Sequence, residues 1–244
     1  MIRKVLLFTI AFALPAHAHD FWIEPSTFRP VAGKTFTASL RVGTDFAGDP
    51  VPRSAALMDS FVVRDAAGER AVNGLENQDP AGFVRVDEAG TAVIGYKSKA
   101  SPLEITPEKF AQFLREEGIG GVTVPNGPHR ENFYRFAKTL VRVGNGPSNV
   151  QKPLGYRLEL VPANDPFTTA PLQLKLVYET KPLANALITA ISAEDGSHMT
   201  ARSDAQGRAA LKLGKGVWLI KATHLVRTKS GQWESLWASL TFER

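Results

Sequence analysis

The sequence contains no cysteine among its 244 residues, which excludes disulfides, zinc–thiolate sites, iron–sulfur clusters and cysteine nucleophiles. A bound metal would therefore need histidine, carboxylate, backbone or water ligands. Basic residues form no block: the 29 lysines and arginines are scattered and are offset by 24 acidic residues. Nucleic acid is therefore not an expected partner. The motifs of serine hydrolases, zinc proteases, phosphate-binding loops and dinucleotide-binding folds are also missing.

Long apolar stretches are scarce as well. The longest run, residues 5–14, is apolar except for one threonine and is too short to span a bilayer. It follows two basic residues and precedes Ala16-His17-Ala18, which places small residues at the −3 and −1 positions of a cut after Ala18. This arrangement predicts a signal peptide at residues 1–18. We expect a periplasmic or secreted protein that does not span the membrane once the signal is removed.

The mature chain has the pattern of a mainly β protein with two β-sandwich-like domains. In the first domain, residues 19–165, short alternating strands are interrupted by two predicted helices at about 106–118 and 130–140. Thr106 and Pro107 are typical of a helix start. The second domain, residues 166–244, has regularly spaced alternating strands after a proline-containing joint, and this predicts a self-contained β-sandwich.

Cleavage after Ala18 would make His19 the first residue of the mature chain. Its free amine and its imidazole could then close a chelate ring on a divalent metal, and the amine loses its proton easily near neutral pH. The alternative is that His19 is only the point where the peptidase cuts. A cut after Ala16 would leave His-Ala-His, which also binds copper or nickel.

His224 is the histidine that lies on a predicted strand, residues 217–226. Alternation along this strand places His224 on the apolar face, where a buried imidazole needs a hydrogen-bond partner or a metal. The alternative is a core histidine satisfied by a hydrogen bond. His19 and His224 are thus candidate metal ligands, with Asp20 and His198 as weaker candidates. His198 and His129 are expected in exposed loops.

Several other polar residues have simpler interpretations. Glu116 and Glu117 are expected to form the solvated end of the first helix. Asp45 and Asp49 lie in a glycine-rich segment where they could bind a cation, but turn formation also explains them.

A series of motifs in fixed order resembles the bacterial periplasmic family called domain of unknown function 4198. The motifs begin with His19-Asp20-Phe21-Trp22 after the signal cut and extend over nearly the whole mature chain. The others are Pro25, Arg130-Glu131, Tyr134-Arg135-Phe136-Ala137-Lys138, Val141-Arg142-Val143-Gly144, Pro153-Leu154-Gly155-Tyr156-Arg157-Leu158-Glu159-Leu160-Val161-Pro162, Lys181-Pro182-Leu183, Asp204-Ala205-Gln206-Gly207-Arg208 and Gly216-Val217-Trp218 followed by His224.

The resemblance implies a secreted protein associated with nickel or cobalt uptake, with a transthyretin-like or carboxypeptidase-regulatory-like β-sandwich in its C-terminal half. The histidines of the family pattern correspond to His19 and His224. Our hypothesis is a periplasmic, non-enzymatic accessory protein that captures nickel or cobalt, with copper as the alternative, for a membrane metal-uptake transporter. Two other functions remain open: a copper-dependent oxidative enzyme with an N-terminal histidine chelate, and a metal-free β-sandwich module that binds a glycan or a protein.

Overall fold

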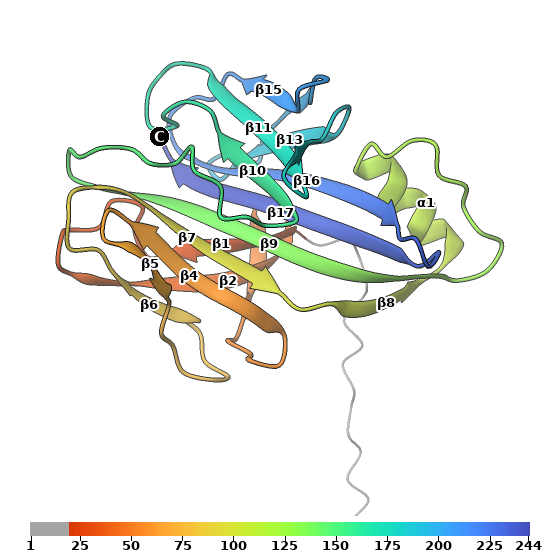
Figure 1. The fold of residues 1–244 in the computed structure, drawn as a ribbon, viewed down its shortest axis with the longest axis horizontal. Helices are drawn as coiled ribbons and strands as arrows, with labels where there is room; N and C mark the ends of the chain where they lie inside the picture. The colour runs from red at the N-terminus through yellow and green to blue at the C-terminus, as the bar shows by residue number, and fades with distance from the viewer. Residues whose placement is uncertain (1–19) are drawn as a thin grey trace, which may run out of the picture.

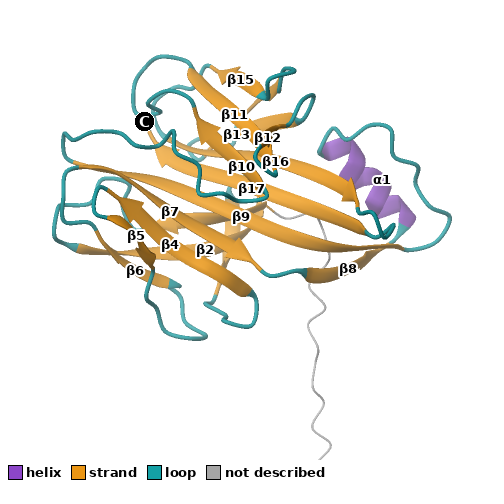
Figure 2. Cartoon of the chain, viewed as in Figure 1, coloured by secondary structure: helices purple, strands orange, loops and turns teal. Residues whose placement is uncertain are grey.

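The computed structural model describes residues 20–244, which form seventeen strands and one α-helix. The fold is mainly β, as predicted, and the strands make three sheets (Figure 2). The N-terminal sheet contains β1 (Asp20–Pro25), β2 (Thr35–Thr44), β3 (Ala47–Val51) and β6 (Gly82–Arg85). The C-terminal sheet contains β10 (Leu158–Pro162), β11 (Leu172–Tyr178), β12 (Lys181–Pro182) and β15 (Arg208–Leu211).

The central sheet is the largest and links the two halves of the chain. Its order is β14-β13-β16-β17-β9-β7-β4-β5, and β8 also pairs with β9. The β9–β17 pair is parallel, whereas the other strand pairs of the described residues are antiparallel. The strands are β4 (Met58–Asp65), β5 (Gly68–Ala71), β7 (Gly90–Ser98), β8 (Ser101–Ile105), β9 (His129–Val143), β13 (Leu187–Ser192), β14 (His198–Arg202), β16 (Val217–Arg227) and β17 (Trp233–Glu243).

The prediction of a helix at residues 130–140 is wrong, because this segment lies within strand β9. Phe136 and Leu140 belong to the core on one face of the central sheet, while Ala137 and Val141 belong to the core on the other face. A strand buried on both faces has consecutive apolar residues, and its alternation is lost. The spacing of the apolar residues then resembled that of a helix by coincidence.

The central sheet therefore separates two hydrophobic cores. The N-terminal sheet covers one face over β4, β7 and β9, and the C-terminal sheet covers the opposite face over β9, β13, β16 and β17. The proposed boundary at residue 165 lies between β10 and β11, which pair with each other. The division into two independent domains stays a prediction, and the two cores share the strand β9.

The first predicted helix is confirmed as α1 (Pro107–Glu116), which lies at one end of the long strands β9, β16 and β17 (Figure 1). Thr106 caps it by accepting a hydrogen bond from the Lys109 backbone N–H at 3.4 Å. Phe110 and Phe113 are buried against Leu225 and the tryptophans of β17. Leu225 and these tryptophans lie on the face of the central sheet that the N-terminal sheet covers. Helix α1 and strand β1 are therefore on the same face of the central sheet.

Candidate metal centre at the start of strand β1

Strand β1 is anchored on the central sheet through its consecutive large apolar residues. Phe21 and Ile23 enter the N-terminal core, and Trp22 packs against Ile191 and Leu219 of the central sheet. The Thr241 hydroxyl of β17 also donates a hydrogen bond to the Ile23 carbonyl at 2.8 Å. Because β1 is fixed in this way, its first residue, Asp20, has a defined position on this face.

Asp20 takes part in a buried ionic cluster with residues distant in the sequence. The Lys221 Nζ, from the middle of β16, lies 2.8 Å from Asp20 Oδ1 and 3.2 Å from Glu117 Oε1. Asp20 is only 5% exposed and Glu117 only 6%. The expectation that Glu117 is solvated is therefore wrong: α1 ends over the central sheet, which turns the Glu117 side chain inward toward Lys221, while Glu116 stays exposed.

Burial determines the electrostatics of this cluster. It raises the pKa of the Asp20 carboxyl, against the opposing effect of Lys221, and the carboxylates of Glu117 and Asp45 add to the rise. Burial lowers the pKa of Lys221, but its two carboxylate partners outweigh burial and leave that pKa raised. The site therefore holds more negative charge than its single ammonium group neutralises.

Asp45 and His198 lie at the edge of the same face. Asp45 and Phe46 form the two-residue turn between β2 and β3, with positive φ angles of 54° and 63°. The register pairs Asp20 with Gly43, two residues before Asp45, so this turn lies at the same end of the N-terminal sheet as Asp20. The His198 Nε2, at the start of β14, lies 2.9 Å from Asp45 Oδ1. The weaker predicted candidates Asp20 and His198 are thus on one face of the central sheet.

His224 lies on the other face. It follows Ile220 and Ala222, which belong to the core under the C-terminal sheet, whereas Lys221 points to the Asp20 side. Its imidazole makes an edge contact with the Tyr178 ring at a centroid distance of 4.7 Å. Burial lowers the pKa of His224 and Glu179 opposes this shift. His224 therefore points inward as predicted, but the central sheet separates it from Asp20. His19 lies outside the described residues.

His129 is also placed differently from the sequence expectation of an exposed loop. It begins strand β9, is 3% exposed, and stacks on Phe110 of α1 at a centroid distance of 3.6 Å. Its Nε2 lies 2.9 Å from Glu131 Oε2, and the Ser235 hydroxyl donates to the other Glu131 oxygen. In this network the glutamate separates the serine from the imidazole, so it is not a serine–histidine catalytic arrangement. It fills the space under α1.

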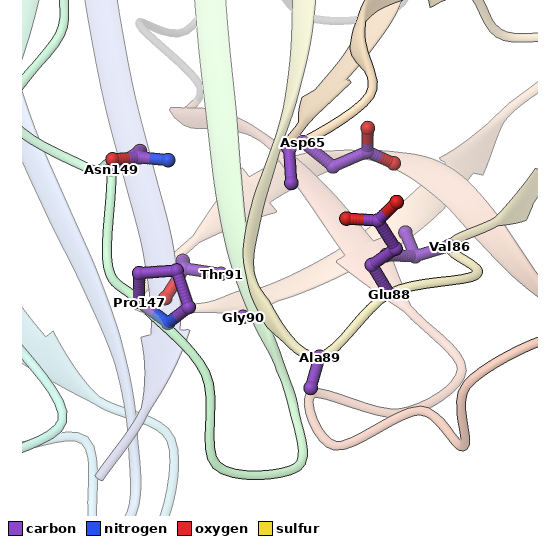
Figure 3. A pocket seen from close by; sticks show the side chains of 9 residues that line it. Asp65, Val86, Glu88, Ala89, Gly90, Thr91, Pro147 and Asn149 are labelled. Atoms are coloured by element: carbon purple, nitrogen blue, oxygen red, sulfur yellow. The ribbon is translucent and has the colours of Figure 1, made fainter.

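Two surface hollows lie away from the cluster. One, of about 720 Å³, is lined by polar residues of β4, β5, β7 and the segment 148–152. The smaller one beside it, of about 10 Å³, lies between Asp65 and Glu88 on one side and Pro147 and Asn149 on the other (Figure 3). Asp65 is already paired with Arg70 at 2.8 Å. Neither hollow is lined by a histidine or by a residue of the Asp20 cluster.

Two members of the cluster, Lys221 and Glu117, were missed from the sequence. Lys221 follows the apolar residues 217–220 in the middle of a strand, and a lysine in that position usually has a buried partner of opposite charge. Within residues 20–244 no group of three or more histidine, aspartate and glutamate residues is arranged to hold a metal. A complete metal site would therefore need a ligand from outside this part of the chain. No helix in the described residues is long and apolar enough to cross a membrane.

The fold and the cluster define the chain as a mainly β protein of stacked sheets whose first strand is held by buried ion pairs. The chain belongs to the family described as domain of unknown function (DUF4198), whose model matches residues 16–226. The matched range includes the predicted cleavage site after Ala18, the Asp20 cluster and His224. Among curated proteins, none matches this chain.

Proposed function

We propose that this protein captures a divalent metal in the periplasm and delivers it to a membrane metal-uptake transporter. Nickel or cobalt is the preferred cargo and copper is the alternative. The observation that carries the proposal is the pair of buried carboxylates, Asp20 and Glu117, on Lys221, with Asp45 and His198 paired at the edge of the same face. These residues provide oxygen and nitrogen donors and an excess of negative charge, which attracts cations.

His19 would supply the ligands that the described residues lack. It directly precedes Asp20 in the sequence. After cleavage at Ala18, its amine and imidazole would give two nitrogen donors close to the carboxylates. His198 would supply a third nitrogen. Such a mixed nitrogen and oxygen donor set suits nickel, cobalt and copper.

The arrangement favours His198 over His224 as the second imidazole. His198, Lys221 and Asp20 share one face of the central sheet, whereas His224 belongs to the opposite face. If His198 is the second ligand, its mutation should weaken metal binding and mutation of His224 should not; if His224 is the second ligand, the reverse is expected. This difference provides the test.

Isothermal titration of nickel, cobalt and copper into the exported, processed protein should detect one high-affinity site. Adding one alanine before His19 should abolish it, since the chelating amine moves to another residue. His198→Ala should weaken binding about 10-fold or more, while the matched variant His224→Ala should leave it within a factor of about two. Binding should also weaken below about pH 6, because protons compete for the imidazoles and the amine.

Three results would contradict parts of this proposal. Loss of affinity in His224→Ala alone would favour the pairing of His19 with His224. Unchanged affinity in the protein with the added alanine would place the site elsewhere. Copper-dependent consumption of peroxide in the presence of a polysaccharide would favour the oxidative enzyme.

A further inference from the structure

Lys221 occupies an unusual position for a lysine. It extends from the middle of β16 onto a face where its neighbour Leu219 is buried, and its side chain is 21% exposed. Its ammonium lies between two carboxylates that are almost fully buried, at 2.8 Å from Asp20 and 3.2 Å from Glu117. A cation bridging two buried carboxylates at these distances takes the place that a divalent metal would take between the same oxygens.

A second, independent observation comes from the neighbouring strand. Ser239 of β17 is the direct cross-strand partner of Lys221, so both side chains are on the same face. Ser239 is 5% exposed, and its hydroxyl oxygen has no hydrogen-bond partner among the described residues. Buried hydroxyl groups normally have a partner. The surroundings of Lys221 therefore include an oxygen donor that the ion pairs leave unused.

The charge of the cluster is also incomplete. Asp20 and Glu117 place two carboxylates on one ammonium. At the edge, Asp45 is paired with His198, and the Arg202 guanidinium donates to the Gly118 carbonyl beside Glu117. A lysine side chain is long, flexible and strongly hydrated, so it can leave an ion pair for solvent when a stronger cation arrives. The partial exposure of Lys221 provides the route.

We propose that Lys221 is an internal placeholder for the metal: its ammonium neutralises Asp20 and Glu117 in the metal-free protein, and the incoming divalent cation displaces it. This inference rests on the proposed function and adds a mechanism of release. When the metal leaves, Lys221 returns to the two carboxylates, and this competition keeps binding reversible, as a protein that passes on its cargo requires. Ser239 would contribute a further oxygen donor.

The test on the unmodified chain is amine labelling followed by mass spectrometry. The processed protein is exposed to an amine-reactive reagent with and without saturating nickel. The labelling rate of Lys221 should rise several-fold with nickel, because the ammonium is released to solvent. Lys175, exposed on β11, is the internal control and should not change. An unchanged or slower Lys221 rate in protein that binds nickel would overturn the inference and leave the proposed function standing.

The second arm measures nickel affinity in Lys221→Met, which keeps the side-chain length and removes the charge. Without the competing ammonium, affinity should increase about 10-fold or more. If the two uncompensated carboxylates prevent folding without metal, nickel should restore the folded circular dichroism spectrum, which the wild type does not need. A variant that binds nickel no more tightly than wild type, or that nickel fails to refold, overturns the inference. Absence of nickel, cobalt and copper binding in wild type would instead remove the proposed function itself.

Discussion

The two faces of the central sheet each carry a lysine paired with a buried carboxylate, and the two pairings differ in how completely their charges are balanced. On the C-terminal face, Lys138 lies 2.7 Å from Glu159, with side chains only 2% and 1% exposed. Glu159 also accepts hydrogen bonds from the backbone N–H groups of Leu154, Gly155 and Tyr156 at 2.7, 2.9 and 3.1 Å. Every strong acceptor site of this carboxylate has a donor, and no charge is left over.

On the N-terminal face, one ammonium is shared by two carboxylates, and a third carboxylate is close to Asp20. A buried hydroxyl without a partner among the described residues does not distinguish the faces, because Tyr156 has one beside Glu159 just as Ser239 has one beside Lys221. A fully paired carboxylate stabilises the fold and has no free position for a ligand, because any ligand would have to break an existing contact. An unsaturated cluster with excess negative charge favours a cation. The balance of charge within the cluster, more than burial itself, therefore separates a structural ion pair from a candidate binding site.

The largest expected effect is loss of folding when the C-terminal part of the chain is separated from the rest, because residues from both parts build its core. This core includes Phe136 and Leu140 of β9 and Leu158 and Leu160 of β10. A fragment of residues 166–244 lacks all four, so we expect a coil-like circular dichroism spectrum and no cooperative melt, unlike the intact mature chain. The sequence pattern alone predicted the opposite. A cooperative melt of the fragment would show that the face formed by β13, β16 and β17 is stable by itself.

Mutating the saturated pair Lys138–Glu159 should lower the free energy of unfolding far more than mutating the Asp20 cluster. Glu159→Ala leaves the Lys138 ammonium and three backbone N–H groups buried without their acceptor. We expect a loss of about 3–5 kcal/mol in the free energy of unfolding, measured by urea titration. Lys175→Met on the exposed side of β11 is the control and should cost less than about 0.5 kcal/mol. A loss similar to that of the control would mean that the pair contributes little to the fold.

The matching change on the other face is Asp20→Asn. Burial raises the pKa of Asp20, so its charged form is less favoured in the folded chain than in water. Lys221 keeps Glu117 as a partner, and the amide can still accept a hydrogen bond. We expect a loss of about 1 kcal/mol in urea titration, clearly smaller than for Glu159→Ala. Metal affinity should fall in this variant and stay unchanged in Lys175→Met. Equal losses of stability at the two sites would remove the distinction between them.

The sequence predicted much of the fold because most strands have one polar and one apolar face. Residues 35–42 and 172–178 alternate in this way and lie within β2 and β11. β9 was missed since both of its faces are buried and the alternation is lost. The Asp20 cluster was only partly predicted: Asp20 and His198 were named as candidates, but Lys221 and Glu117 are 104 residues apart and meet only through the packing of α1 over β16. Local sequence patterns contain no information on such a contact.

The smallest expected effect is the pH dependence that His224 gives to the C-terminal face. Burial lowers the pKa of His224 below its ordinary value of 6.5, with Glu179 acting in the opposite direction. Below pH 6.5 the unfolded chain therefore binds a proton that the folded chain binds less readily, so the free energy of unfolding falls as the pH decreases through the lowered pKa. In His224→Phe this loss should be absent, while the ring contact with Tyr178 can be kept. Urea titrations at pH 7.5 and pH 5 measure the difference, with His198→Ala, exposed at the edge of the other face, as the matched control. If His224→Phe and His198→Ala lose equal free energy of unfolding on acidification, the burial of His224 does not contribute to the pH dependence. His224 would then be more accessible to water than its packing against Tyr178 indicates.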